Sequence, residues 1–295
     1  VYTEKDNEFY IGVGRSKSGE YIVIWNGSTL VNDYHLLNAN TPNGDFFNFT
    51  PRGTKHEYSL VHYGEKFYIL TNWEAENNRL METSKDLTDM SNWKEMIPHN
   101  KDVHLLDMEI FDNHLVLSER ENGLRGLRVI NLITGDQHSV NFGEEAYASY
   151  LSTNKEFNTN VLRYNYSSLV TPWSTYDYNM DTKEKTLMKE TKVLGDFDKE
   201  NYTSERIYAD ARDGKQVPIS LVYKKDLKTE NAQNLLLYGY GSYGSTTDPY
   251  FSSSRISLLD RGFVFAIAHI RGSPVSYTHL RAHETREERV WPGLD

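Results

Sequence analysis

Residues 234–244 read NLLLYGYGSYG, and this stretch decides the fold class of the second part of the chain. Residues 234–240 form a continuous apolar run bounded by turn residues, which is typical of a β-strand buried on both faces of a sheet. The run leads directly into glycines 239, 241 and 244, a literal G-x-G-x-x-G. A strand of this kind argues against a purely all-β binding module and favours an additional domain of another class.

The segments on either side of this stretch complete an α/β pattern. Residues 206–225 predict a β-hairpin with alternating apolar side chains around an Asp213-Gly214 turn. Residues 252–262 have a serine cap, spaced apolar residues and a final glycine, and they predict a short helix. Residues 263–270, FVFAIAHI, predict a second buried strand, which we expect to form an unprotected edge of the sheet. Strand, loop, helix and strand in this order indicate the beginning of an α/β sheet.

The glycine loop has three possible interpretations: a nucleotide-binding loop, a structural turn or an oxyanion loop. A dinucleotide site needs a helix that starts at the glycines, whereas here STTDPYFS (245–252) intervenes and contains Pro249. The acidic residue at the expected distance, Asp260, stands before the next strand and not at its end. An oxyanion loop requires glycines that let the backbone approach a substrate, and a Tyr hydroxyl can serve as its donor.

Residues 1–196 show short alternating segments separated by turn signals, as half-buried antiparallel strands do. Segments that open at Phe67, Leu115 and Leu162 recur at a spacing of about 47–48 residues. Repeats of 40–50 residues with several short strands are the signature of propeller blades, and a β-sandwich would not predict this spacing. About four blades fit into the segment, so we expect an incomplete ring.

Composition excludes several classes of function. The 295 residues include no cysteine, which excludes disulfides, thiolate catalysis and cysteine-ligated metal, and fits a reducing compartment. The formal net charge of −10 argues against nucleic acid as a partner, because phosphate binding requires a basic face. No apolar stretch reaches the roughly 18 residues of a membrane span. We therefore expect no membrane partner and a cytoplasmic location.

Three stretches carry a resemblance to a known family: LLLYGYGSYG (235–244), FSSSRISLLDRGFVFAIAHIRG (251–272) and ARDGKQVPISLVYKK (211–225). They resemble the prolyl oligopeptidase family of serine peptidases, and most of all its oligopeptidase B branch, which cuts peptides after Arg and Lys. The resemblance covers about residues 1–272. It implies a seven-bladed β-propeller that caps an α/β-hydrolase domain and screens out folded proteins.

The resemblance implies a division of the chain into domains. Residues 1–196 would be the C-terminal part of the β-propeller, with about four of its seven blades, and residues 197–205 a linker. Residues 206–273 would be the truncated N-terminal part of the α/β-hydrolase, or peptidase, domain. Two alternative functions stay open: a proline-specific oligopeptidase of the same family and a non-catalytic propeller binding module. The latter predicts a closed ring and no hydrolase strands after residue 205.

The resemblance also implies site residues. Tyr240 matches the Tyr that donates to the oxyanion, and Gly239 and Gly241 flank it in the oxyanion loop. The nucleophile elbow G-x-S-x-G occurs nowhere in the sequence, and the Asp and His of the triad follow that elbow in the family. We therefore expect an inactive fragment of an enzyme that acts on short basic peptides, with no metal and no cofactor. The oligomeric state is left open.

Four histidines and the last residues of the chain lie outside this predicted site. We expect structural roles for the histidines, which have no located nucleophile: His62, His104, His138 and His269. PVSYTHLRAHET (274–285) resembles a translated adapter from transposase-based sequencing libraries, so residues 274–295 are predicted to be a non-native tail. As native sequence, His279 and His283 beside Glu284 would offer a zinc pair, but the adapter interpretation is favoured.

Overall fold

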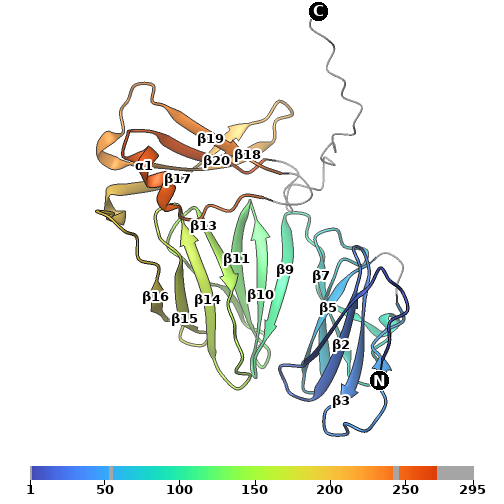
Figure 1. Ribbon diagram of the computed structural model, residues 1–295. Helices are drawn as coiled ribbons and strands as arrows, with labels where there is room; N and C mark the ends of the chain where they lie inside the picture. The colour runs from blue at the N-terminus through green and yellow to red at the C-terminus, as the bar shows by residue number, and fades with distance from the viewer. Residues whose placement is uncertain (1, 53–55, 242–245, 271–295) are drawn as a thin grey trace, which may run out of the picture.

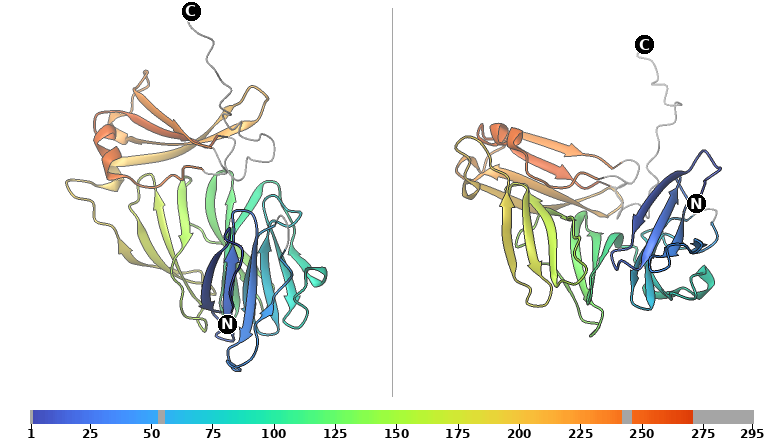
Figure 2. Two further views of the ribbon diagram at one scale, coloured as in Figure 1. Left: turned by 45° about the vertical axis from the view of Figure 1, so that its right-hand side comes forward. Right: turned by 60° about the horizontal axis from the view of Figure 1, so that its bottom comes forward.

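The computed structural model describes residues 2–52, 56–241 and 246–270, and Figure 1 shows how they are arranged. In this part of the chain, four units of four strands follow one another, and a smaller mixed sheet comes after them. The mixed sheet lies across the ends of the strands of the last two units (Figures 1 and 2). The predicted tail, 274–295, lies outside the described residues.

The first two units are separate antiparallel sheets with the strand orders β1-β2-β3-β4 and β5-β6-β7-β8. A 3-10 turn, Met90–Asn92, precedes β8. The strand bounds are β1 Tyr10–Arg15, β2 Tyr21–Gly27, β3 Asn32–Asn38, β4 Phe47–Asn48, β5 Tyr58–Tyr63, β6 Lys66–Thr71, β7 Arg79–Ser84 and β8 Lys94–Ile97.

The third and fourth units are joined into one sheet by a single parallel residue pair, Arg125 of β11 with Ala148 of β13. All other pairs within these two units are antiparallel. The third unit consists of β9 Val103–Ile110, β10 His114–Glu121, β11 Leu124–Asn131 and β12 Gln137–Ser139. The fourth consists of β13 Tyr147–Leu151, β14 Val161–Ser168, β15 Ser174–Asn179 and β16 Lys185–Glu190.

The repeat spacing predicted from the sequence corresponds to the second strand of each unit. Phe67, Leu115 and Leu162 lie in β6, β10 and β14. Alternation along these strands sends successive side chains to opposite faces of a unit, because the side-chain period of a strand is two residues. In β10, Leu115 and Leu117 pack toward the second unit with Leu70, whereas Val116 packs in another cluster toward the fourth. The third unit thus buries both faces against its neighbours, as a propeller blade does.

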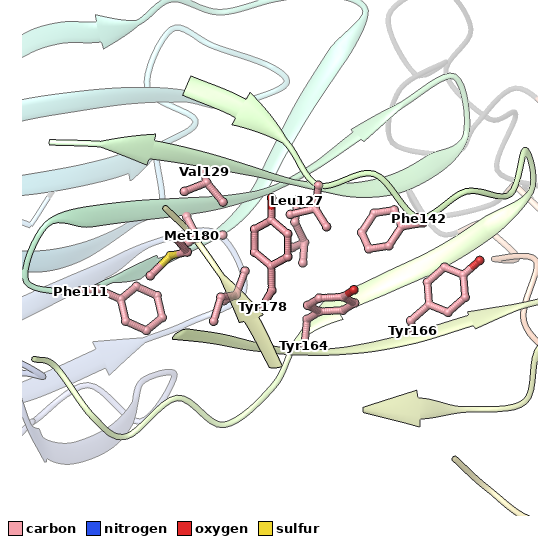
Figure 3. Packing of buried hydrophobic residues seen from close by; sticks show 11 residues of the cluster. Phe111, Leu127, Val129, Phe142, Tyr164, Tyr166, Tyr178 and Met180 are labelled. Atoms are coloured by element: carbon pink, nitrogen blue, oxygen red, sulfur yellow. The ribbon is translucent and has the colours of Figure 1, made fainter. Parts of the chain in front are cut away.

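Figure 3 shows the cluster between the third and fourth units. Leu127 and Val129 of β11 face the rings of Tyr164 and Tyr178 from β14 and β15. All four side chains are at most 4% exposed. Full burial of a side chain of this size contributes roughly 1.5–3 kcal/mol, so packing between units supplies a large part of the stability.

The mixed sheet has the order β17-β18-β20-β19, with β19 and β20 parallel and the other pairs antiparallel. Its predicted hairpin, short helix and second buried strand are present. The bounds are β17 Tyr202–Asp210, β18 Gln216–Lys224, β19 Leu235–Gly239, α1 Ser253–Leu259 and β20 Val264–Ala268, with 3-10 turns at Lys199–Asn201 and Lys225–Leu227. Strands after residue 205 contradict the prediction of a propeller module alone.

Two expectations about this sheet are wrong. The apolar run of β19 is not buried on both faces, because Leu235, Leu236 and Leu237 are 55%, 44% and 56% exposed. Among the described elements, only β20 makes extensive contacts with β19, and in β20 itself Ala266 and Ile267 are buried. The FVFAIAHI strand is also not an edge: β20 pairs with both β18 and β19, and the edge strands of the described sheet are β17 and β19.

Candidate functional site

The predicted oxyanion loop lies at the carboxyl end of β19. Gly239 is the last residue of the strand and pairs with Ala268 of β20. Tyr240 follows it with 43% of its surface exposed, and Gly241 is buried. Ligands of open α/β sheets bind outside the carboxyl ends of the strands, and a phenol hydroxyl placed there can donate a hydrogen bond to one. Residues 242–245 of the loop lie outside the described residues.

The environment of Gly239 shows how much room the strand end has. A Cβ at this position would lie 3.5 Å from the carbonyl oxygen of Ala268 and 3.6 Å from Cγ2 of Ile270, which are ordinary contact distances. Packing within the described chain therefore does not require glycine at position 239. A close approach of the backbone to a substrate remains a predicted reason for it.

The position of α1 is incompatible with a nucleotide loop. The helix begins at Ser253, well after the glycines, and its first turn therefore does not face them. Asp260, the acidic residue considered for the ribose, caps the other end of this helix. It accepts hydrogen bonds from the hydroxyl of Tyr202 at 2.8 Å and from Nζ of Lys224 at 3.1 Å, and these contacts stabilise the sheet.

The end of the loop is fixed to the third and fourth units by a buried polar cluster. Asp248, 8% exposed, accepts from Nη1 of Arg120 at 2.5 Å and from Nη2 at 3.2 Å. The hydroxyl of Tyr150 in β13 also donates to Oδ2 of Asp248. Arg120, the penultimate residue of β10, is 5% exposed and donates to the carbonyl of Gly123 as well. Bidentate pairs of this kind fix geometry in addition to contributing energy.

Burial determines the electrostatics of this cluster. Burial raises the pKa of the Tyr150 hydroxyl, and the Asp248 carboxylate next to it raises it further. Tyr150 is therefore a neutral donor over the physiological range. The guanidinium of Arg125 lies 4.5 Å above the ring of Tyr150, and burial lowers its pKa. The third unit thus presents two cations, Arg120 and Arg125, to this one carboxylate.

A second set of contacts continues the attachment beyond Asp248. The backbone N–H of Phe251 donates to Oγ of Ser167 in β14 at 2.9 Å. The ring of Tyr250 stacks on that of Trp173 with centroids 6.2 Å apart. The segment that follows residue 245 is therefore held by side chains of both the third and the fourth unit.

His269, which follows β20, has a serine partner but not the geometry of a nucleophile–base pair. Its Nε2 lies 2.8 Å from Oγ of Ser220, yet Ser220 is fully buried and His269 is 4% exposed. Burial lowers the pKa of His269 to about 4, and its Nδ1 has no hydrogen-bond partner in the described chain. A base needs an orienting carboxylate at this nitrogen and a pKa near the working pH, so His269 is structural.

The other three histidines considered from the sequence also contact structural partners. His62 contacts Oγ of Ser18 at 2.8 Å, and His138 contacts the hydroxyl of Tyr178 at 2.9 Å. His104 lies 3.4 Å from the side-chain amide of Asn78, and burial lowers its pKa to about 4. In the part of the chain that the structure describes, no three His, Asp or Glu side chains are grouped to hold a metal ion.

A cavity of about 520 Å³ opens where β17 meets the third unit. Four glutamates line it, Glu119, Glu121, Glu144 and Glu145, together with Arg206 and Tyr208 of β17. Burial raises the pKa of Glu119, and Arg128, 2.8 Å away, opposes that rise. The cavity is therefore an acidic hollow beside the junction between the units and the mixed sheet.

The sequence did not predict Arg120, Tyr150 or Asp248 as parts of the site. Arg120 and Asp248 are 128 residues apart in the sequence, and each stands in a segment without a motif. Only the fold brings them together. Among the described helices, none is long and apolar enough to cross a membrane.

Residues 1–191 match the model of the family described as prolyl oligopeptidase, N-terminal beta-propeller domain. Among curated relatives, Dipeptidyl aminopeptidase BI of Pseudoxanthomonas mexicana is 41% identical over 92% of the chain and 38% of its own length. Protease 2 of Moraxella lacunata is 30% identical over 92% of the chain and 39% of its own length. The chain thus spans less than half the length of these relatives.

The chain is also similar to solved structures of the same family. The closed form of oligopeptidase B from Trypanosoma brucei with covalently bound antipain has a TM-score of 0.81 and 32% identity, over 93% of the chain and 40% of its own. Oligopeptidase B from Leishmania major has the same TM-score and 30% identity, over 92% of the chain and 40% of its own. The similarity extends beyond residue 191, because more than nine tenths of the chain is covered.

Proposed function

Since the chain belongs to the prolyl oligopeptidase family, we propose that it is part of a serine oligopeptidase that cleaves short peptides after Arg or Lys. The observation that supports this is the half-exposed Tyr240, which directly follows the carboxyl end of β19 and begins the loop that we propose to hold the oxyanion. Similarity to two oligopeptidase B structures supports the preference for basic residues. The net charge of −10 also favours the approach of cationic substrates.

The proposed reaction is acyl transfer. A serine attacks the peptide carbonyl, a histidine accepts its proton, and an aspartate orients the histidine. The hydroxyl of Tyr240 and one backbone N–H donate to the oxyanion of the tetrahedral intermediate, in a loop where Gly239 and Gly241 leave room for the substrate. The sequence contains no G-x-S-x-G, so the serine elbow would belong to a part of the enzyme outside this chain.

The proposed domain boundaries follow the same assignment. Residues 1–196 would be the C-terminal part of the propeller, 197–205 the linker and 206–273 the first part of the hydrolase domain. The match to the family propeller over residues 1–191 and the change to a mixed sheet from Tyr202 onward support this division.

A panel of amino-blocked peptide p-nitroanilides tests the proposed specificity in the full-length enzyme that contains this chain. Substrates with Arg or Lys before the scissile bond are expected to exceed a Pro substrate in kcat/KM by roughly 10² or more, as for a pocket built for a charged group. A preference for Pro would contradict the proposal and favour the proline-specific alternative.

A second candidate function is the release of dipeptides from a free amino terminus. It is favoured by the 41% identity to a relative named Dipeptidyl aminopeptidase BI. An enzyme of this kind must recognise the terminal ammonium group, whereas an endopeptidase does not require it. Parallel assays with free and acetylated dipeptidyl p-nitroanilides distinguish the two. Cleavage of the free form alone would support the second candidate, and efficient cleavage of the acetylated form supports the first.

A further inference from the structure

The hairpin of β10 and β11 contacts the chain on both sides of the segment that contains Tyr240. On one side, Arg120 is joined to Asp248 by two hydrogen bonds, of 2.5 and 3.2 Å. On the other side, Gly123 in the turn of the same hairpin lies against His269, which follows β20, the strand paired with β19. One hairpin of the third unit therefore contacts the chain after the proposed oxyanion loop, at Asp248, and the residue that follows β20, the neighbour of β19.

Gly123 shows how close this contact is. Its φ is +80°, a conformation that side chains rarely adopt, and a Cβ there would lie 3.0 Å from Cβ of His269. Glycine at this position therefore allows both the left-handed turn and the close approach of the propeller to the mixed sheet. The carbonyl of Gly123 also accepts from Nη1 of Arg120 at 3.0 Å, which holds the guanidinium toward Asp248.

Tyr150 approaches Asp248 from the neighbouring unit. Its hydroxyl donates to the same carboxylate, so the third and the fourth units hold one side chain of the loop between them. The carboxylate is buried, and an unpaired carboxylate at this depth would be costly. Removal of Arg120 is therefore expected to displace Asp248 toward water and to carry the adjoining chain with it.

We propose that Arg120 and Tyr150 are positioning residues of the peptidase reaction. Through Asp248, and through the contact of Gly123 with His269, they would fix the described chain on both sides of Tyr240. The inference rests on the proposed function of Tyr240. It makes the propeller a contributor to the rate of the chemical step. An oxyanion donor works only where it is placed in advance, and a misplacement of about 1 Å can cost on the order of 10² in rate.

The test is a double-mutant cycle in the full-length enzyme that contains this chain, assayed with an amino-blocked arginine p-nitroanilide. Tyr240→Phe alone is expected to lower kcat by about 10²–10³. Arg120→Met alone is expected to lower kcat by roughly tenfold or more, with KM within about twofold. In the Tyr240→Phe background, Arg120→Met should lower kcat by less than about twofold, because the hydroxyl that Arg120 positions is already absent.

The matched control is Arg163→Met. Arg163 forms a bidentate pair with Asp177, at 2.7 and 2.8 Å, on the exposed side of β14 and β15 and away from the loop. It is expected to leave kcat within about twofold, because exposed ion pairs contribute little. A loss as large as that of Arg120→Met would show a general effect of arginine removal and overturn the proposal.

Two further outcomes separate the proposal from the function on which it rests. If Tyr240→Phe is impaired and the losses multiply in the double mutant, the positioning role is overturned and the role of Tyr240 stands. If Tyr240→Phe has wild-type kcat, the proposed oxyanion role itself fails. Should Arg120→Met not fold, Tyr150→Phe replaces it in the cycle, since it removes only one hydroxyl. Tyr150→Phe is expected to lower kcat by about threefold to tenfold, and to have no such effect in the Tyr240→Phe background. An unchanged kcat in Tyr150→Phe would overturn the proposal.

Discussion

His269 is a neutral imidazole buried where the two parts of the chain meet. Its ring is 4% exposed, contacts Ser220 and lies against Gly123. Burial is the main cause that lowers its pKa to about 4; Arg206 and Arg120 lower it further, and Asp248 opposes them. A histidine in an unfolded chain has a pKa near 6.5, so folding changes the affinity of this group for protons.

We predict that the free energy of unfolding decreases as the pH falls from about 6.5 to 4, by up to about 3 kcal/mol from His269. The sign follows from proton binding: in this window the unfolded state binds the proton and the folded state does not. Above pH 6.5 the contribution is complete. Urea unfolding between pH 4 and 7.5 measures it, and His269→Gln should flatten the pH dependence. If the free energy of unfolding of His269→Gln depends on pH as steeply as that of the wild type, the prediction is contradicted. The control is His99→Gln, which replaces an exposed histidine.

At the residue scale, sequence patterns located only those residues whose neighbours in the sequence form a recognisable motif. Tyr240 could be located because an apolar strand and a glycine loop surround it in the sequence. Its role stays a proposal. The partners that hold its loop, Arg120 and Tyr150, stand 128 and 98 residues from Asp248, where no periodicity connects them. A buried ion pair of this kind follows from the packing of whole units and not from spacing.

β19 is the element that differs most from its sequence pattern. Its side chains are strongly apolar, yet Leu235, Leu236 and Leu237 are each more than 40% exposed. The strand also lies at an edge of the mixed sheet, and no other described strand pairs with its outer side. An exposed apolar edge strand pairs readily with other chains.

We predict that Leu236→Lys reduces aggregation of the purified chain, because a charge on an edge strand opposes edge-to-edge pairing. Light scattering over time at a fixed protein concentration measures the effect. The control is Leu194→Lys, which places the same charge at a leucine that is 85% exposed and outside any strand. Equal effects of the two substitutions would show that net charge alone, and not the strand edge, controls aggregation.

At the element scale, the sequence spacing correctly predicted where the strands of the repeated units lie. The apolar pattern was a poorer guide to which strands are buried. The second strands of the units fall where the spacing from Phe67 to Leu162 places them, because every unit repeats the same order of strands and turns. The error at β19 has a physical reason. An apolar run shows that a strand can be buried, but only its neighbours in space determine whether it is.

At the scale of the whole molecule, the chain is a series of sheets joined mainly by side chains. The first two units are separate sheets, and one residue pair links the third to the fourth. Apolar clusters lie between successive units, and a further one joins Ala146 and Leu169 to Val222, Leu259 and Ile267 of the mixed sheet and its helix. Among the described residues these units do not close into a ring (Figure 2).

We predict that the purified chain of 295 residues has no peptidase activity. It contains the oxyanion donor proposed here but no G-x-S-x-G elbow, and an oxyanion donor without a nucleophile forms no acyl-enzyme. Incubation with an arginine ester and a lysine amide measures this. Hydrolysis above the rate in buffer would contradict the prediction, once a mock purification shows that no contaminating peptidase is present.

The single pair between Arg125 and Ala148 has a mechanical consequence. Within a unit, a change of shape must break ladders of backbone hydrogen bonds, which act together and in fixed register. At the boundary between β11 and β13, one unit can rotate against the next at the cost of one backbone pair and of side-chain contacts. Small rotations at successive boundaries add up. The chain is therefore expected to bend mainly between units, while each four-stranded sheet keeps its shape.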